Sequence, residues 1–262
     1  MLNEPMFLYL ACFFYTLSFV ACGFSPKNGS YHFTIAASFL GLGFHTYNIW
    51  LRWDRVGHGP FINLYEILSS NLWSLTLGLL IFMLIAKQYR SMSRNIVPIL
   101  LMLMIWLLIT PAKDTFLPPT YNTVWLYFHV FSGKIFLSLL LLATASAFYG
   151  LRLSKPISPS ISTPEVLTLS YRLLAFAFCF ESIMLFFGAV WAQDAWGRYW
   201  AWDPLETWAF LTWMSLLFVL HWRKDSSHPR IYAVMVIGCF IIAFLTFFGV
   251  PFVSTAPHKG MI

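Results

Sequence analysis

Charged residues are scarce in this chain of 262 residues. Asp, Glu, Lys and Arg make up 10% of the sequence, whereas hydrophobic residues make up 59%. Soluble domains carry about 25% charged residues, so the composition excludes an ordinary soluble domain and indicates a polytopic membrane protein. The formal net charge of +6 is then explained by basic loops on one side of a membrane, and we expect no nucleic-acid partner.

Cysteine is also scarce, and its placement argues against two kinds of site. The sequence has no C-x-x-C pair, and all four cysteines lie within apolar runs: Cys12, Cys22, Cys179 and Cys239. We therefore expect neither a disulfide framework nor a zinc site. The sequence also lacks C-x-x-C-H, the motif to which haem is covalently attached.

Eight apolar runs approach the length that a helix needs to cross a membrane. They cover residues 6–23, 32–51, 64–86, 95–111, 124–150, 167–190, 207–222 and 231–250. The sequence therefore predicts an all-α polytopic integral membrane protein, with one transmembrane helix for each run and a single membrane domain over residues 1–262. The first run lacks a basic n-region and a clear cleavage site, so we expect a retained helix rather than a signal peptide.

Lysine and arginine are distributed unequally between the two alternating sets of loops. One set holds nine of these residues and the other holds five. The richer set is expected to be cytoplasmic, because positive charge in loops marks the cytoplasmic side. Both termini, and the segment between the sixth and seventh runs, are then expected to be external.

Tryptophans crowd the segment between the sixth and seventh runs. Residues 191–208 read WAQDAWGRYWAWDPLETW and contain five tryptophans. Irregular backbone cannot lie in lipid, so we expect an external loop. Clustered indoles form a flat apolar surface with N–H donors at its edges, which suits a large planar ligand with polar margins. The alternative is that these tryptophans only anchor the chain at the membrane interface.

This segment resembles the tryptophan-rich WWD signature of the CcsA (ResC) family of cytochrome c biogenesis proteins. Every fixed position of the pattern W-G-x-x-W-x-W-D-P-x-E-x-W is filled. The residues that fill it, which the resemblance implies lie at a haem-binding site, are Trp196, Gly197, Trp200, Trp202, Asp203, Pro204, Glu206 and Trp208.

Three charged side chains of the WWD segment are expected to have different roles. Arg198 can pair with a haem propionate, because guanidinium and carboxylate form strong bidentate pairs. Asp203 and Glu206 cannot pair with an ionised propionate. We expect these two carboxylates to hold the loop, with Asp203 accepting from backbone or indole N–H groups.

A second segment, GHGPFINLYE over residues 57–66, resembles the same family. Two interpretations of Glu66 are open. It is either a functional intramembrane carboxylate or a structural one that holds a neighbour in place: Tyr65, Arg52 or Arg55. His58 either lines the external site or caps a turn.

Three histidines are candidate axial ligands to haem iron, a role that neutral imidazole often fills. His129 lies near the external end of the fifth run, and His258 lies just beyond the external end of the eighth. The resemblance implies that these two ligate one external haem. His221 lies about 20 Å from Trp208 along a helix. If it binds haem, it serves a second, transmembrane site, which the resemblance implies is shared with a CcsB (ResB) partner. The alternative is an interfacial residue that snorkels beside its basic neighbours.

His45, in the second run, has two open interpretations. It is expected to be a polar contact between helices, and the alternative is an internal substitute for the histidine that the partner would supply.

The resemblance implies a haem-handling subunit of the cytochrome c synthase complex. Such a subunit takes haem b from the cytoplasmic side, presents it externally and positions it for thioether attachment to C-x-x-C-H of apocytochrome c. It would act as part of a haem lyase with a CcsB/ResB-like membrane protein, and a thiol-reducing thioredoxin-like protein is a further candidate partner.

The expected location is a bacterial inner membrane or a thylakoid membrane, with a periplasmic or lumenal active face. Two alternative functions stay open. One is a haem transporter or chaperone without synthase activity, and the other is a dihaem quinol-oxidising membrane anchor.

Overall fold

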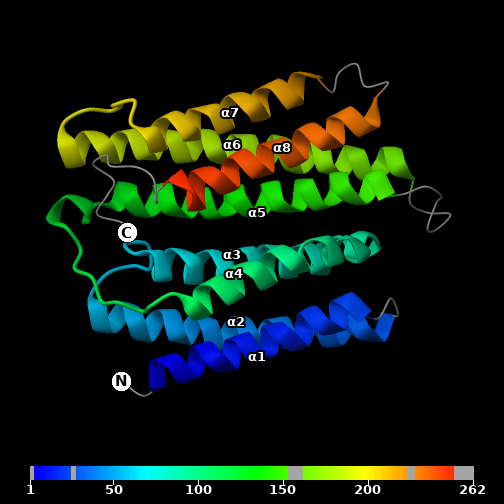
Figure 1. Ribbon diagram of the computed structural model, residues 1–262, viewed down its shortest axis with the longest axis horizontal. Coiled ribbons are helices and arrows are strands. Elements are labelled where there is room, and N and C mark those ends of the chain that lie inside the picture. Colours follow the sequence, from blue (N-terminus) through cyan, green and yellow to red (C-terminus); the bar gives the residue numbers. More distant parts are fainter. Residues whose placement is uncertain (1–2, 25–27, 153–161, 223–227, 251–262) are drawn as a thin grey trace. The chain divides into compact units, whose positions relative to one another are not determined.

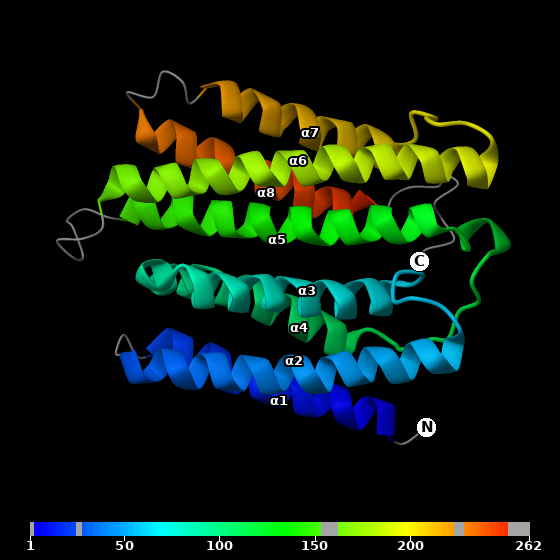
Figure 2. The ribbon, with the colours of Figure 1, turned by 180° about the vertical axis from the view of Figure 1, so that it is seen from behind.

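The computed structural model describes residues 3–24, 28–152, 162–222 and 228–250. Helices dominate this part of the chain, as the sequence predicts (Figures 1 and 2). The chain forms two compact units, Met1–Leu117 and Pro118–Ile262. The single membrane domain predicted for residues 1–262 stays a prediction beside this division.

The first unit contains four α-helices and one 3-10 helix within the described residues. The α-helices are α1 (Asn3–Phe24), α2 (Asn28–Val56), α3 (Leu64–Ile85) and α4 (Val97–Ile109), and the 3-10 helix η1 (Lys87–Asn95) leads into α4. α2 packs against α1 and α3, and α4 packs against α3 and α1. The four α-helices therefore form a small bundle.

The second unit is built from four longer α-helices within the described residues. They are α5 (Val124–Arg152), α6 (Thr163–Trp196), α7 (Pro204–Trp222) and α8 (Pro229–Phe248), and the 3-10 helix η2 (Pro119–Tyr121) precedes α5. α5 packs against α6 and α8, while α7 packs against α8 and α6. In Figures 1 and 2, α5 and α6 lie side by side over most of their length.

The eight predicted runs coincide with the eight α-helices of the described chain. Five of these helices are long and apolar enough to cross a membrane, and the count becomes six if η1 and α4, bent by 51°, form one span. α2 and α7 do not pass this test, because polar residues are interspersed along them. The multi-pass helical fold is confirmed, and the number of eight spans stays a prediction.

The largest difference between a predicted boundary and the structure lies at the end of α6. α6 continues to Trp196, so Trp191 and Trp196 are helical and the irregular segment is limited to residues 197–203. The predicted run ended at residue 190 because the sequence becomes polar there. Leaving an apolar environment does not by itself end a helix, since the backbone bonds within a helix are satisfied locally.

His45 makes a polar contact between helices of the first unit. Its Nδ1 lies 3.2 Å from the Tyr15 hydroxyl on α1, and its Nε2 lies 2.9 Å from the Ser69 hydroxyl on α3. The imidazole is 0% exposed, and both ring nitrogens have partners. The expected role as a helix–helix contact is therefore confirmed.

Candidate functional site

Gly197 ends α6 and begins the tryptophan-rich turn. Its backbone is left-handed, with φ 76°, and its N–H donates to the Gln193 carbonyl at 2.9 Å. Glycine adopts this conformation without the steric penalty that a Cβ would bring. The left-handed turn that ends α6 therefore explains why the WWD segment has a glycine at this position.

The two carboxylates of the WWD segment hold the turn and start α7. An Asp203 oxygen accepts the Glu206 N–H at 2.9 Å, and a Glu206 oxygen accepts the Ala201 N–H at 2.6 Å. Pro204 is the first residue of α7, a position where a missing N–H does no harm. The D-P-x-E sequence is thus a helix N-terminal cap, and both carboxylates hold the loop as expected.

Trp202 is presented outward by an unusual backbone conformation. Its φ is 57°, the left-handed region, which is an outlier for a bulky residue. The indole is 66% exposed, and it meets Trp200 and Phe210 edge-on, with ring centroids 5.8 and 5.9 Å away. Left-handed backbone at a non-glycine residue stores about 1–3 kcal/mol and is typical of functional sites.

Two other residues of this turn, Trp200 and Arg198, offer hydrogen-bond donors. The Nε1 of Trp200 is buried and has no hydrogen-bond partner within the described chain. Arg198, on the adjoining part of the turn, is exposed. An indole N–H and a guanidinium both suit an acidic group of a ligand.

His129 of α5 is oriented by the backbone of α6. Its Nδ1 lies 2.8 Å from the Met184 carbonyl oxygen, and a carbonyl can only accept, so Nδ1 carries the proton. In the neutral ring the lone pair then lies on Nε2, the atom that can coordinate a metal. A backbone acceptor of this kind is the usual way in which a ligating histidine is oriented.

A glycine lets α6 approach the His129 ring. A Cβ at Gly188 would lie 2.7 Å from the His129 Nδ1 and 3.0 Å from its Cε1. Real Cβ atoms essentially never show the first distance, and the second is tighter than most of their contacts. The ring also lies nearly parallel to Trp191, at 6.1 Å between centroids and 29° between planes. The imidazole is therefore fixed between a carbonyl, a glycine and an indole.

Trp191, the first residue of the tryptophan-rich segment, connects His129 to the rest of that segment. Its side chain is 2% exposed, and its ring meets Tyr121 edge-on at 5.0 Å and Trp196 at 5.1 Å. Its Nε1 donates to the Thr120 carbonyl at 3.3 Å. His129, Trp191 and Trp196 thus form one continuous aromatic cluster, whereas Trp208 lies further along on α7.

His221 has the same kind of orienting bond as His129. Its Nδ1 lies 2.8 Å from the Leu217 carbonyl oxygen, and the residue is exposed near the end of α7 that is remote from Trp208. The structure therefore separates His221 from the aromatic cluster, as the sequence predicts. His258 lies outside the described residues.

His58 differs from His129 and His221. Its Nδ1 lies 3.0 Å from the Gly59 carbonyl oxygen and its Nε2 lies 2.9 Å from the Thr115 carbonyl oxygen. Both ring nitrogens are directed at backbone acceptors, so this side chain holds loops together. His58 was expected either to line the external site or to cap a turn, and this geometry agrees with the second interpretation.

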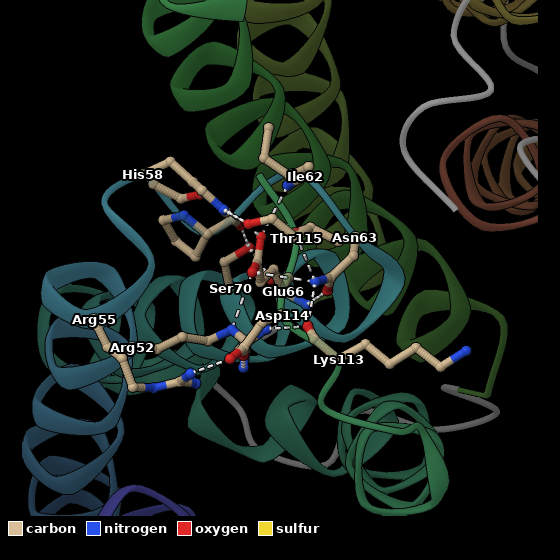
Figure 3. A network of polar contacts seen from close by, with 12 residues as sticks. Arg52, Arg55, His58, Ile62, Asn63, Glu66, Ser70, Lys113, Asp114 and Thr115 are labelled. Atoms are coloured by element: carbon tan, nitrogen blue, oxygen red, sulfur yellow. Dashed lines mark hydrogen bonds and ion pairs between the residues drawn. The ribbon is translucent and has the colours of Figure 1, made fainter. Parts of the chain in front are cut away.

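Glu66 is the centre of a buried polar network in the first unit (Figure 3). Its carboxylate accepts from the Arg52 Nε at 3.0 Å, the Ile62 N–H at 3.0 Å and the Asn63 amide at 3.2 Å. Arg52 is 4% exposed and Glu66 is 1% exposed. The Arg52 guanidinium also lies over the Tyr65 ring, 4.9 Å from its centroid. Glu66 holds Arg52 in place, which is one of the structural roles considered for it.

Arg55 extends the network toward solvent. It pairs with Glu4 at 2.8 Å and with Asp114. The bond from Arg55 holds the pKa of the Asp114 carboxyl below its ordinary value. Asp114 is 60% exposed, so solvent screens this outer pair much more than the inner one.

The same network holds the backbone of the segment after α4 (Figure 3). The Lys113 carbonyl accepts from Arg52 Nη2 at 2.5 Å and from the Asn63 amide at 3.0 Å. Asn63 also donates to the Thr115 hydroxyl at 3.2 Å, and His58 bonds the Thr115 carbonyl. We call this arrangement the clasp: the side chains of Arg52, Arg55, His58, Asn63 and Glu66, together with residues 113–115 that they hold.

Glu181 of α6 was not among the residues singled out from the sequence. It is 0% exposed, and its carboxyl oxygens have no hydrogen-bond partner within the described chain. It occupies a core position of α6 between the buried residues Ala177 and Met184. The signal was available, because a single acid within an apolar run is a functional-site hypothesis by default.

Comparison with known proteins identifies the family. A family model described as cytochrome C assembly protein matches residues 61–258. The cytochrome c biogenesis protein CcsA of Prochlorococcus marinus (strain MIT 9215) is 30% identical over 250 residues, which cover 82% of this chain and 80% of that protein. The chain belongs to the CcsA family.

Other CcsA relatives agree with this assignment. CcsA of Chlamydomonas reinhardtii is 31% identical over 227 residues, covering 80% of this chain and 63% of the algal protein. The CcsA family places the chain in cytochrome c biogenesis, as a multi-pass membrane protein. The matched region includes the whole WWD segment and His129.

A solved structure shares the fold. The cytochrome c haem lyase CcmF superposes with a TM-score of 0.72 at 16% identity, over 94% of this chain. The chain spans about half the length of CcmF, 46%. At this identity the likeness shows a shared fold and not a shared activity.

Proposed function

We propose that this protein is the haem-handling subunit of a cytochrome c synthase. It takes haem b from the cytoplasmic side, presents it at the external face and positions it for thioether attachment to C-x-x-C-H of apocytochrome c. The observation that carries the proposal is His129, which is oriented by the Met184 carbonyl and stacked on Trp191, the first residue of the WWD segment. The external face is periplasmic in a bacterial inner membrane and lumenal in a thylakoid.

The residues of the turn have distinct parts in holding haem. His129 and His258 are the two axial ligands of the external site, and Trp202 offers its outward indole to the porphyrin face. Arg198 and the Trp200 N–H receive the propionates, since both are donors and the guanidinium forms strong pairs with carboxylates. Gly197, Pro204 and the two capping carboxylates keep this surface in shape, with Trp196 and Trp208 flanking it.

The chain contributes orientation to the reaction. Bound haem supplies two vinyl groups, and each cysteine thiol of the apocytochrome adds across one of them, so that an S–H bond and a π bond are replaced by S–C and C–H bonds. His129 fixes the porphyrin against the indoles, and such positioning alone accelerates a reaction between two bound partners. The thiols must arrive reduced, which is why a thioredoxin-like reductant is a candidate partner.

His221 is the ligand of a second haem site on the cytoplasmic side. Its Nδ1 bond to the Leu217 carbonyl leaves the lone pair of the neutral ring on Nε2, and its exposure allows a second protein to approach. A CcsB/ResB-like membrane protein supplies the opposite ligand. The two sites give haem an entry point and a point of use.

Co-expression tests the proposal. The protein is produced with a CcsB/ResB-like partner and an apocytochrome c, and both bound haem b and covalent holocytochrome are measured. Accumulation of holocytochrome that depends on His129 supports the synthase. Bound haem without holocytochrome supports a transporter or chaperone, and retained haem that quinol reduces rapidly supports a dihaem anchor. Purified protein that carries no haem overturns all three.

Gly188→Ala should weaken haem retention without unfolding the protein. The new methyl group meets the His129 ring, so the imidazole loses its bond to the Met184 carbonyl. Loss of such an orienting contact lowers metal affinity by roughly 10- to 100-fold, and haem titration of the purified protein measures it. Gly238→Ala is the matched control, because nothing lies within 4 Å of a Cβ there. Equal haem affinity in the two variants would contradict the assignment of His129.

Trp202→Gly should stabilise the protein while it weakens haem binding. Glycine relieves the left-handed strain, so we expect the free energy of unfolding to rise by about 1 kcal/mol. The lost indole lowers haem retention. Trp50→Gly is the control, since this exposed tryptophan lies inside α2, where glycine costs about 1 kcal/mol. A destabilised Trp202→Gly with unchanged haem binding would show that the indole serves only the fold.

A further inference from the structure

Buried polar side chains follow one another through the first unit, from the clasp to η1. They begin at Ser69, one turn after Glu66 on α3, and end at Ser93 in η1. α3 has 22 residues, so it is about 33 Å long at 1.5 Å per residue, close to the thickness of the apolar core of a membrane. We call these side chains the polar row. Its members, each at most 3% exposed, are Ser69, His45, Tyr15, Ser18, Cys22 and Ser93.

Three contacts between helices join members of the polar row. The Ser69 hydroxyl lies 2.9 Å from the His45 Nε2, and the Tyr15 hydroxyl lies 3.2 Å from the His45 Nδ1. Further along, the Cys22 thiol lies 2.9 Å from the Ser93 hydroxyl. The polar row therefore passes from α3 to α2, from α2 to α1, and from α1 to η1.

The remaining steps join residues one turn apart on a single helix. Tyr15, Ser18 and Cys22 of α1 are separated by three and four residues, so they lie on one face of that helix. Glu66 and Ser69 of α3 are also three residues apart. Cβ atoms at this spacing are about 5–6 Å apart, a gap that one water can bridge. The polar row thus continues to the Glu66 carboxylate of the clasp.

The partners of His45 allow its ring proton to lie on either nitrogen. A hydroxyl both donates and accepts, so each neutral tautomer of His45 keeps two hydrogen bonds. The ring is neutral, because it is fully buried and neither partner is an acid. His129 and His221 face backbone carbonyls, which only accept and therefore hold the proton on Nδ1. Among these three histidines, only His45 is placed to exchange its tautomers.

The packing around Tyr15 leaves no room for a hydrated ion. A Cβ at Gly41 would lie 2.6 Å from the Tyr15 Cδ1 and 2.7 Å from its Cε1, so this ring packs directly on the backbone of α2. The same ring lies 5.8 Å from the His45 ring, between centroids. A proton can still pass here, because it moves between groups that are already hydrogen-bonded. Chains of ionisable side chains within a membrane commonly serve as proton relays.

We propose that the polar row carries protons between the two ends of the first unit, with His45 as the relay residue. The Tyr15 hydroxyl gives its proton to Nδ1 while Nε2 gives its own proton to the Ser69 hydroxyl. Tyr15 recovers a proton from the Ser18 side, and Ser69 passes one on. No electron moves, and the reverse order carries a proton the other way.

The two ends of the polar row differ in chemistry. The Glu66 carboxylate accepts the proton at the clasp end, where Asp114 is 60% exposed and meets solvent. The other end lies in η1, on the side expected to be cytoplasmic. This gives the buried side chains of the first unit a role that haem ligation leaves unexplained. The proposal does not rest on the proposed function, since it requires no haem.

Proton flux into liposomes tests the proposal. The full-length protein is reconstituted into liposomes that contain a pH-sensitive dye, and a potassium gradient with valinomycin drives protons inward. His45→Gln keeps a side chain that can bond both hydroxyls, but an amide does not release one proton as it accepts another. This variant should lower the flux to that of protein-free liposomes.

His32→Gln is the matched control, since it makes the same substitution at an exposed residue of the same helix. Its flux should equal that of the original protein. A folded His45→Gln variant that retains the flux overturns the proposal. So does an original protein whose flux is no greater than that of protein-free liposomes.

Nitrogen NMR of the ring atoms tests the relay if His45→Gln does not fold. In full-length protein labelled with ¹⁵N-histidine, His45 should show both tautomers, whereas His129 and His221 should show only the form protonated on Nδ1. Ser69→Ala identifies the His45 resonances and removes one hydroxyl. One tautomer then loses the partner of its N–H, so the other should be favoured roughly 5- to 150-fold, the ratio for one unpaired buried donor. A single His45 tautomer before the substitution overturns the proposal.

Discussion

His129→Ala should strip the external haem from the purified protein. Removal of a second-sphere partner lowers metal affinity by about 10- to 100-fold, and removal of the ligand itself should exceed that range. Pyridine haemochrome spectra of protein purified with its partner measure the loss. Because the imidazole leaves a space between Gly188 and Trp191, added imidazole should restore the spectrum of the ligated iron. If His129 had only a structural role, added imidazole would not restore this spectrum.

The controls for this experiment are other histidines. His32→Ala changes an exposed residue of α2 and should leave haem content unchanged. His221→Ala should remove haem from the second site only, so its loss and that of His129→Ala should add. If His129→Ala retains its full haem content, the external ligand is another residue and the Met184 contact serves packing alone.

The positions of the helices could be predicted from the sequence because lipid imposes a minimum length of apolar chain. Every predicted run became a helix, and the largest boundary difference arose at α6, which continues to Trp196. Which face of each helix packs against the protein core could not be predicted from the sequence in the same way. Phe176 is 60% exposed while Leu174, two residues earlier, is 0% exposed. Lipid and protein core both favour apolar side chains, so periodicity does not separate them.

Only part of the chemistry of the site could be predicted from the sequence. The D-P-x-E cap at Asp203 and Glu206 carries its own signal, because side-chain caps act on residues close in sequence. The bond between His129 and the Met184 carbonyl has no such signal, since every residue has a carbonyl. Arg52 was one of three neighbours named for Glu66, and only the fold distinguishes the buried Arg52 from the more exposed Arg55.

Arg52→Met should destabilise the first unit more than any exposed charge substitution. Arg52 and Glu66 are almost fully buried and bonded to each other. Removing one partner of such a pair leaves an uncompensated buried charge, which costs about 3–5 kcal/mol. Glu66→Leu should cost a similar amount, since it leaves the Arg52 guanidinium with its longer contacts of 3.4 Å to Glu4 and 3.7 Å to Asp114. Titration with a denaturing detergent in mixed micelles measures the free energy of unfolding.

Arg55→Met is the matched control for this effect of burial. Arg55 lies one turn after Arg52 on α2 and also makes two ion pairs, but it is 35% exposed. An exposed ion pair contributes about 0–1 kcal/mol, so this variant should remain close to the original protein. If Arg55→Met is as destabilising as Arg52→Met, the number of ion pairs and not their burial governs stability here.

The double variant Arg52→Met/Glu66→Leu decides what the buried pair is for. Replacing both charges with apolar groups removes the unpaired charge, so stability should return toward that of the original protein. The recovery should be incomplete, because the Ile62 N–H, the Asn63 amide and the Lys113 carbonyl each lose a partner. Full recovery would show that the pair has no role beyond filling space.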